Sequence, residues 1–196
     1  QKFGMGNIIS FEGDKLNIKV SLSNKTELEK LFILLSKESM KIDNVVYIGR
    51  SISSGMVGMK VSEKMQSSTY QGANCCEIIT ILQAIDGYKK YYSDEIVLNL
   101  IETEVIRIGN ELIDFTSDSG VLGLIPTIHY EYPNIRARYI DVSSQIIDSD
   151  TEINHLIHFL NSPEKMLSVA IRKQLVWTEH LEKIQLSDNL IPHKQL

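Results

Sequence analysis

The sequence predicts an α/β fold in which a mainly parallel sheet is flanked by helices. Helical and extended patterns alternate along most of the chain, and two short runs, Val45–Ile48 and Ile96–Ile101, are rich in β-branched and other apolar residues. Such runs are typical of strands buried on both faces, which occur mainly in parallel sheets. Each crossover must pack back onto the sheet, which explains the alternation. The predicted class is a Rossmann-like α/β domain.

The amino-terminal part of the chain is predicted to be extended and then helical. Apolar residues recur near period two around the turn signal Gly13–Asp14, which predicts a hairpin or an edge strand in residues 1–20. Thr26 and Glu29 have the spacing of a capping box, so we expect a helix to begin there. The apolar stripe of this helix consists of Leu28, Leu31, Phe32 and Leu35.

A loop and a second helix are predicted between the two apolar runs. Gly49–Ser68 is polar and rich in glycine and serine, and we expect a long surface loop. A helix is expected over Tyr70–Tyr88, because apolar residues recur there at helical spacing. After the second run, Gly109–Asn110 is a strong turn dipeptide and predicts a hairpin over Val105–Phe115. The stripe of the helix consists of Cys75, Ile78, Ile81, Leu82, Ala84 and Ile85.

A third helix and a further strand follow. Ser117–Glu131 has helical spacing, but Pro126 lies inside it and removes a backbone donor, which predicts a kink or a late helix start. Arg136–Val142 is predicted to be a strand. The apolar stripe of the helix consists of Val121, Leu124, Ile125 and Ile128.

The carboxyl-terminal part is predicted to hold one helix and two closing strands. Ser149 and Glu152 form a second capping box at the start of the helix. The strands are expected at Leu167–Ile171 and Leu175–Leu181. The stripe of the helix consists of Ile153, Leu156, Ile157 and Leu160.

Length and composition restrict the function classes. The 196 residues (22.3 kDa) suit one domain, and 43% hydrophobic with 23% charged residues is typical of a folded protein. The net charge of -5 and the lack of a basic run argue against nucleic-acid binding, and we find no membrane span or signal peptide. Cys75 and Cys76 form no disulfide framework, which favours a reducing, cytoplasmic location. The start at Gln1 suggests a piece of a longer protein.

A dinucleotide-binding loop is not recognisable in the sequence. Such a loop places glycines directly after a strand, so that the backbone approaches the pyrophosphate. Gly49, Gly55 and Gly58 follow the first apolar run, but serine stands where each known pattern requires its second glycine, at Ser51 or Ser53. We therefore expect no cofactor-binding residue in this chain.

The catalytic pair of short-chain reductases is also missing. Those enzymes use a tyrosine as the acid and a lysine four residues later, which lowers the pKa of the phenol. No tyrosine of this chain has a lysine at that position. The tyrosines are Tyr47, Tyr70, Tyr88, Tyr91, Tyr92, Tyr130, Tyr132 and Tyr139.

Other candidates are better explained by structure than by chemistry. His155 and His158 lack further metal ligands nearby, so we expect surface or boundary histidines. Cys75 lies on an apolar stripe and is expected to be a small buried side chain, although a thiolate at a helix start is the alternative. Ser53-Ser54-Gly55 lacks the leading glycine of a nucleophile elbow.

The remaining candidates are a tryptophan and two acidic pairs. Trp177 is expected to cover the core from a terminal strand. The acidic pairs Glu102/Glu104 and Asp114/Asp118 lie in turn-rich sequence and are expected to be solvated. We therefore predict no catalytic, cofactor-binding or metal-binding residue in this chain.

Several short motifs follow one another in the second half of the chain. Within Asp118–Pro133, Gly123-Leu124 matches the start of a GLGR pattern, and Glu131-Tyr132-Pro133 matches an EHP pattern. Arg138–Asp141 then resembles a strand that ends in aspartate, and Leu167–Arg172 resembles an E-x-A-x-R strand. In this order the motifs resemble the structural subdomain of modular polyketide synthase ketoreductases.

The resemblance extends over residues 14–185 and includes Leu175–Leu181 as the strand that leaves the subdomain. Its individual motifs are short, and their order and spacing carry it. Three positions depart from the pattern: Ile125 replaces a glycine, Pro126 replaces the arginine and Tyr132 replaces the usual histidine.

The resemblance implies a structural role without chemistry. In this family the second Rossmann-like half binds NADPH and carries the catalytic serine, tyrosine and lysine, whereas the first half binds no cofactor and stabilises the second. The expected partners are that catalytic subdomain, other synthase domains and an acyl carrier protein. The predicted domains are an extended segment or linker (1–20), a truncated Rossmann-like subdomain (21–186) and a linker (187–196), ending before any glycine-rich loop of the catalytic half.

Two alternatives remain open from the sequence. The chain is alternatively a degenerate ketoreductase subdomain that serves dimerisation or docking within the synthase. The other alternative is an independent reductase-like enzyme with an unfamiliar site in the Gly49–Ser68 loop.

Overall fold

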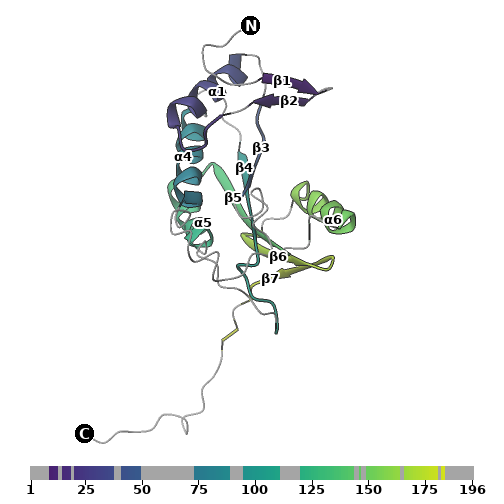
Figure 1. Cartoon of the computed structure of the whole chain (residues 1–196). Coiled ribbons are helices and arrows are strands. Elements are labelled where there is room, and N and C mark those ends of the chain that lie inside the picture. Colours follow the sequence, from purple (N-terminus) through teal and green to yellow (C-terminus); the bar gives the residue numbers. More distant parts are fainter. Residues whose placement is uncertain are drawn as a thin grey trace, which may run out of the picture.

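The computed structural model describes residues 9–12, 15–18, 20–37, 41–49, 73–88, 95–110, 120–143, 146, 149–163, 166–180 and 182–183. These residues form a five-stranded sheet in the order β3-β4-β5-β6-β7 and a separate two-stranded sheet, β1-β2. Helices lie on both faces of the larger sheet (Figure 1). The predicted α/β class, a truncated Rossmann-like fold, is confirmed.

The larger sheet is parallel except at one edge. Strands β3 (Asn44–Ile48), β4 (Ile96–Thr103), β5 (Ile135–Val142) and β6 (Ser168–Arg172) are parallel, and β7 (Leu175–Thr178) pairs antiparallel with β6. All four parallel strands therefore end at the same edge of the sheet. Each was predicted to within a few residues.

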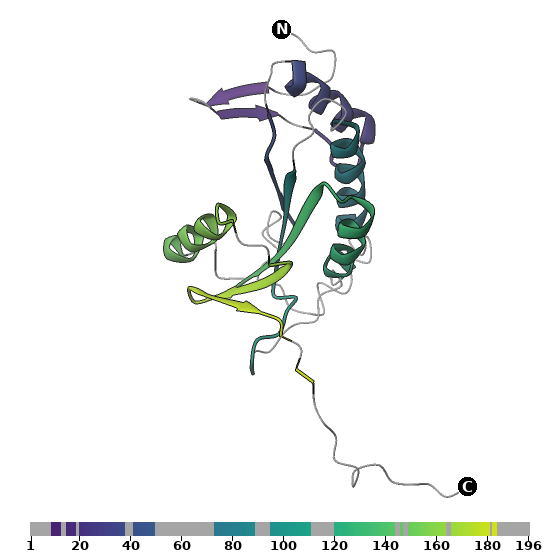
Figure 2. The same cartoon turned by 180° about the vertical axis from the view of Figure 1, so that it is seen from behind.

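The smaller sheet is the predicted amino-terminal hairpin. Strand β1 (Ile9–Glu12) pairs antiparallel with β2 (Lys15–Ile18). Seen from behind, it lies beside α1, at the end of the molecule farthest from β7 (Figure 2).

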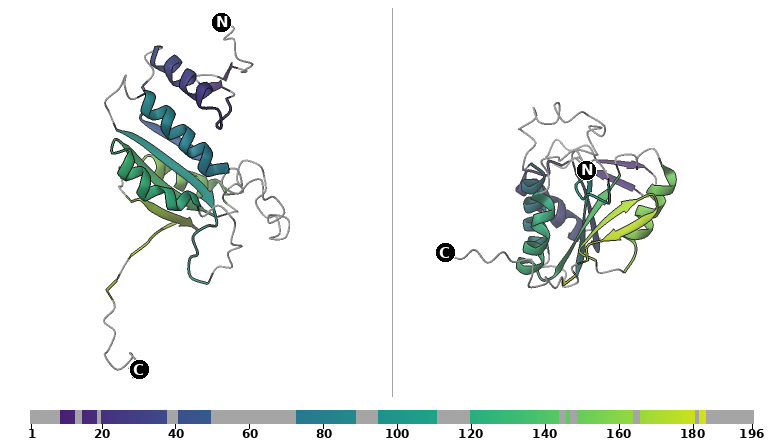
Figure 3. Two further views of the ribbon diagram at one scale, coloured as in Figure 1. Left: turned by 90° about the vertical axis from the view of Figure 1, so that its left-hand side faces the viewer. Right: turned by 90° about the horizontal axis from the view of Figure 1, so that it is seen from below.

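Three helices cover one face of the larger sheet and one helix lies on the other. Helices α1 (Lys25–Lys37), α4 (Ala73–Tyr88) and α5 (Gly120–Glu131) lie side by side on the first face (Figure 3). Helix α6 (Asp150–Leu160) lies on the second face. Among the described residues, no helix has the length and hydropathy that crossing a membrane requires.

Both helix starts predicted from capping boxes are present, but one is displaced. Ser149 caps α6 as predicted, accepting a hydrogen bond from the backbone of Glu152. The α1 box is formed instead by Asn24, which accepts from the backbone N–H of Glu27 at 3.3 Å. Thr26 therefore lies inside the helix. Asparagine is as good an N-cap as threonine. The Glu27 carboxylate accepts from the Asn24 side-chain amide and from the backbone N–H of Ser21, whereas the backbone N–H of Asn24 donates to the Ser21 carbonyl, so the reciprocal bond of a capping box is replaced.

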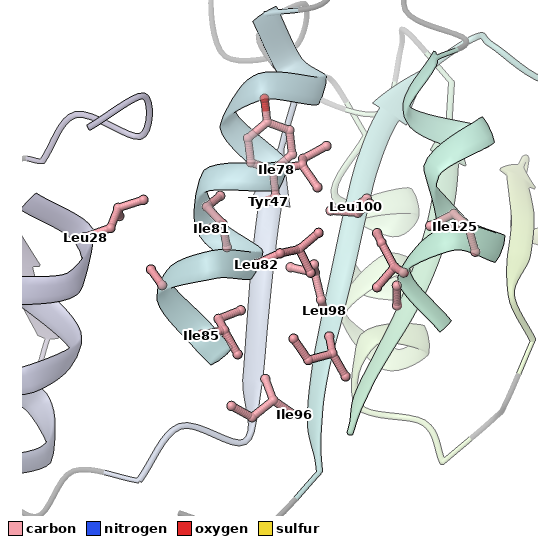
Figure 4. Close-up of a cluster of buried hydrophobic side chains, with 14 of the residues drawn as sticks. Leu28, Tyr47, Ile78, Ile81, Leu82, Ile85, Ile96, Leu98, Leu100 and Ile125 are labelled. Atoms are coloured by element: carbon pink, nitrogen blue, oxygen red, sulfur yellow. The ribbon is translucent and has the colours of Figure 1, made fainter. Parts of the chain in front are cut away.

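The main core lies between α1, α4, α5 and the sheet. Figure 4 shows isoleucine and leucine side chains of α4 directed at β3 and β4. Ile78, Ile85, Leu98 and Leu100 are fully buried there. A smaller core under α6 contains Ile101, Ile140, Val142, Ile146, Phe159, Val169 and Ile171.

Three details differ from the predictions. Strand β3 is an edge strand whose second face is open, so Val46 and Ile48 are 43% and 51% exposed rather than buried. On α6, Ile153, Leu156 and Leu160 of the predicted stripe pack against the smaller core, but Phe159 is buried beside them and Ile157 is exposed. Helix α5 continues through Pro126.

The predicted hairpin over Val105–Phe115 is wrong in the described part. Strand β4 ends at Thr103 and residues 104–110 form no strand, although a turn is present where Gly109 has a positive φ of 60°. The backbone N–H groups of Val105 and Ile106 donate to the Asp141 carboxylate, so they cannot continue a ladder. Residues 111–115 lie outside the described part.

Candidate functional site at the carboxyl ends of the strands

Ligands of open α/β sheets bind outside the carboxyl ends of the parallel strands, where the strand order reverses. In this chain that edge is formed by the ends of β3 to β6 and by the start of α4. The order of the described strands runs in one direction from β3 to β6, so the described sheet has no such reversal. Polar side chains nevertheless gather at this edge in two groups.

The first group centres on Glu102 of β4. Its side chain is 1% exposed and accepts hydrogen bonds from Asn74 Nδ2 at 3.0 Å and from the Tyr139 hydroxyl at 3.1 Å. The prediction that Glu102 is solvated is therefore wrong. The pleat of β4 places Glu102 on the same face as Leu98 and Leu100, which is the face that α4 covers.

The start of α4 completes this group. The Tyr47 hydroxyl lies 2.9 Å from both Asn74 Oδ1 and Glu77 Oε2. Asn74 and Glu77 are themselves buried, and Ser23 Oγ lies 3.4 Å from Glu77 Oε1. Glu77 in the second turn of α4 and Glu102 beside the Asn74 side chain thus lie near the amino-terminal end of this helix, which is the end that binds phosphates in other proteins.

Gly49 belongs to the same group. A Cβ at this position would lie 3.1 Å from Glu102 Cγ and 3.2 Å from the Ile101 carbonyl oxygen. Because Gly49 has no side chain, the backbone can pass close to Glu102 as it leaves β3. The atoms nearest to Gly49 therefore belong to the protein interior. Gly55, Gly58, Ser51 and Ser53 lie outside the described residues.

The second group centres on Asp141 of β5, which is fully buried. Its carboxylate accepts from the backbone of Val105 and Ile106 at 2.9 and 3.0 Å and pairs with Arg172 of β6 at 2.7 Å. Burial raises the pKa of Asp141 above its ordinary value, although the bonds from Val105 and Arg172 act in the opposite direction. Arg172 also donates to the Ile106 carbonyl at 3.1 Å. This pair fixes the segment that follows β4.

A second buried cation, Arg138, lies on the α6 face of the sheet. It donates to Asn99 Oδ1 at 2.8 Å and to the Leu160 carbonyl at 2.9 Å, and its guanidinium lies 5.4 Å from the centre of the Phe159 ring. A cation at the carboxyl end of a helix binds its last carbonyls and stabilises its dipole. Arg138 therefore attaches α6 to the sheet.

A cavity of about 420 Å³ lies between the segment after β4, the start of α5 and the β6–β7 pair. Trp177 forms part of its wall and is 44% exposed, so it does not cover the core as predicted. The strand pairing explains this, because Trp177 lies opposite Ala170 on the outermost strand. The lining residues are mainly apolar, and Arg107 and Glu179 are the charged ones.

The structure brings no other predicted candidates together. His158 is exposed and His155 is half-buried, and no three potential ligand residues in the described part of the chain are placed to hold a metal. Cys76 is exposed and Cys75 is half-buried. Glu104 is half-buried with a positive φ of 53°, whereas Asp114 and Asp118 lie outside the described residues.

Sequence reasoning missed both buried groups. The available signal was the presence of charged or amide residues inside otherwise apolar strand runs. Those residues are Asn99 and Glu102 in β4, Arg138 and Asp141 in β5, and Arg172 in β6.

The comparisons with known proteins support the fold. No protein-family model matches this chain, and no curated protein matches it significantly. Among solved structures, it is similar to an adenylation, ketoreductase and pseudo-Asub multidomain structure of a keto acid-selecting NRPS module. The TM-score is 0.59 at 14% identity, over 81% of this chain and 12% of that chain.

Two further structures are similar over most of this chain. The NADH-dependent reductase A1-R′, responsible for alginate metabolism, matches with a TM-score of 0.50 at 11% identity, over 80% of this chain and 74% of that chain. An aldohexose dehydrogenase of Thermoplasma acidophilum matches with a TM-score of 0.45 at 16% identity, over 79% of this chain and 60% of that chain. The chain has a reductase-like Rossmann fold. It spans 12% of the multidomain chain that it matches.

Proposed function

We propose that this chain is the non-catalytic structural half of a polyketide synthase ketoreductase. In this proposal it packs against a separate NADPH-binding half that reduces a β-ketoacyl thioester on an acyl carrier protein. The reductase-like fold supports the ketoreductase part of the proposal. The order of the motifs from Gly123-Leu124 through Glu131–Pro133 to Asp141 supports the synthase part.

The occupied carboxyl edge of the sheet is the observation that carries the proposal. A pyrophosphate needs unopposed N–H groups at a helix start. Here Glu102 Oε1 accepts from the Asn74 side-chain Nδ2 at 3.0 Å beside the first turn of α4, and Glu77 is buried in the second turn. Two carboxyl groups near this end of the helix disfavour a phosphate there, which supports the proposal that this half binds no cofactor.

Two of the buried tyrosines, Tyr47 and Tyr139, support the proposed absence of reductase chemistry in this chain. The Tyr139 hydroxyl donates to Glu102, and the Tyr47 hydroxyl contacts Asn74 and Glu77. A catalytic tyrosine has to reach a substrate carbonyl and to be assisted by a lysine. Both hydroxyls are instead used inside the protein.

The multidomain neighbour supports the context. That protein combines a ketoreductase with other domains in one chain, and this chain matches a small part of it. The structural half of a ketoreductase is likewise a small part of the large synthase chain that contains it. We place the protein in the cytoplasm, where the free thiols of Cys75 and Cys76 remain reduced.

A turnover assay tests the proposal directly. The purified chain is incubated with NADPH and a β-ketoacyl thioester of N-acetylcysteamine, and NADPH oxidation is followed by absorbance. A ketoreductase that contains both halves is the positive control. The expected result is no oxidation above the rate without protein, and steady turnover would establish the independent-enzyme alternative.

A docking role within the synthase is the second candidate. The exposed apolar side chains of β7, Leu175 at 59% and Trp177 at 44%, favour it. Such side chains on a terminal strand are typical of a surface that binds protein. This role is compatible with the absence of catalysis and is developed below for one partner.

A further inference from the structure

The outer edge of β7 lacks the features that normally protect an edge strand. It is the last strand in the sheet order, and no described strand pairs with its outer side. Edge strands are usually protected by charged residues, proline or a bulge. Leu175, Val176, Trp177 and Thr178 provide none of these, and Leu175 and Trp177 are among the most exposed large apolar side chains.

The turn before β7 determines which backbone groups point outward. Lys173 and Gln174 both have positive φ values, 46° and 68°, as in the two-residue turn that joins twisted strands. The pair that flanks such a turn, Arg172 and Leu175, exchanges both backbone hydrogen bonds. Because bonding alternates along the strand, Val176 and Thr178 direct their N–H and C=O groups to the outer edge.

We propose that two copies of this chain associate through β7, antiparallel and centred on Val176. A two-fold pairing must place outward-pointing residues opposite each other, which leaves registers centred on Leu175, Val176, Trp177 or Thr178. Only the Val176 register places Leu175 opposite Trp177 of the second copy. The same register brings Lys173 next to Glu179 of the second copy, and both contacts occur twice by symmetry.

The other three registers are unfavourable. Centring on Leu175 places Lys173 opposite Trp177, and centring on Trp177 places Leu175 opposite Glu179. Centring on Thr178 places Trp177 opposite Glu179. Each therefore sets a charge against an apolar side chain, whereas cross-strand pairs of like polarity and opposite charge stabilise a sheet. The dimer joins the two sheets into one and does not depend on the proposed lack of catalysis.

Sedimentation velocity of the whole chain over a concentration series tests the association. A four-residue strand contact is small, so we expect dissociation in the range of about 10 to 500 µM. The mass should rise from 22.3 kDa towards twice that value. Trp177 is the only tryptophan, and its emission should shift to shorter wavelength with the same midpoint. A monomer at every concentration overturns the proposal.

A proline variant tests the outer edge. Val176→Pro removes an outward N–H that does not bond to β6, and proline is tolerated at such positions. Val176→Ala is the matched control, since it loses side-chain packing but keeps the N–H. We expect the proline variant to stay monomeric and the alanine variant to dimerise within about threefold of the original affinity. Dimerisation of a folded proline variant as strong as that of the parent contradicts the proposal.

Charge reversal tests the register and does not alter the strand itself. Lys173→Glu or Glu179→Lys should each weaken association about fivefold, because two attractive pairs become repulsive. The double variant restores the opposite charges and should return within about twofold of the parent. Failure of the double variant to recover contradicts the Val176 register. None of these results changes the outcome of the NADPH turnover assay.

Discussion

Glu102 is a carboxylate in the protein interior, and its donors come from two other elements. The pleat of β4 carries it under α4, where Asn74 and Tyr139 donate to its two oxygens. Removing a donor from a buried charged acceptor costs more than the bond contributes when it is formed. The stability of this site therefore depends on each partner.

Asn74→Ala should lower the free energy of unfolding by about 2 to 3 kcal/mol, because it leaves one oxygen of Glu102 without its donor. Urea denaturation followed by circular dichroism measures the change. The matched control is Asn154→Ala on the exposed side of α6, which should change stability by less than about 0.5 kcal/mol. Equal effects of the two substitutions would show that Glu102 is hydrated.

Arg172→Met should destabilise the protein by about 3 kcal/mol at neutral pH, because Asp141 loses its ion-pair partner. The pKa of Asp141 is raised from 3.8 by burial, so its stabilising contribution is present at acid pH and is lost as pH rises through the raised pKa. Loss of the guanidinium raises that pKa further. The cost of the substitution should therefore be smaller at pH 4 than at pH 7.

Unfolding experiments at the two pH values measure this difference. Arg107→Met is the control, since Arg107 lies in the segment that Asp141 holds but is exposed. It should have little effect at either pH. A cost of Arg172→Met that is larger at pH 4 would contradict the assigned role of the pair.

The polar residues inside the apolar strand runs indicated that buried polar groups exist, but the sequence did not reveal their partners. Glu102 and Glu104 are the same residue type two positions apart. If β4 ended two residues earlier, Glu102 would be exposed to solvent. Asp141 was singled out only through a resemblance, and its bonds to Val105 and Ile106 depend on where the chain turns after β4. Such contacts are set by tertiary packing, which periodicity does not contain.

At the scale of elements, the contact between α4 and α5 depends on one glycine. A Cβ at Gly120, the first residue of α5, would lie 3.1 Å from Cys75 Sγ of α4. Gly123 in the same helix has open space around its Cα. An added methyl group would therefore press against Cys75 at position 120 but would meet no other atom at position 123.

Gly123→Ala should stabilise the protein by about 0.5 to 1 kcal/mol through helix propensity. Gly120→Ala should instead destabilise it by about 1 kcal/mol, because the new methyl group displaces the Cys75 side chain. Thermal unfolding measures both. Adding Cys75→Ala to Gly120→Ala should remove the penalty, and a penalty that persists would place its cause elsewhere.

The elements themselves were largely predictable, and the errors have physical causes. Strands of a parallel sheet appear in the sequence as apolar runs, so β3, β4 and β5 were predicted. The exposure of Val46 and Ile48 was missed because an apolar run does not reveal that its strand is at the edge of the sheet. The start of α1 was displaced because Asn24 and Thr26 are both good caps, and the Glu27 carboxylate selects the first.

At the scale of the whole molecule, the sheet resembles one half of a doubly wound fold. Its described parallel strands follow one another in one direction, and hydrogen-bonded polar side chains lie at the carboxyl ends of β4 and β5. Alternation of elements was sufficient to predict this class. The prediction that this chain holds no cofactor site rests on missing motifs, and the bond between Asn74 and Glu102 is the structural observation on which the proposed function relies.

Calorimetric titration of the purified chain with NADPH tests the central claim most directly. The account predicts no binding heat up to about 1 mM nucleotide, because carboxylates face the start of α4 where the pyrophosphate would have to bind. A ketoreductase containing a catalytic half, titrated in the same buffer, is the control for active nucleotide. Saturable binding of NADPH to this chain with micromolar affinity would contradict the account.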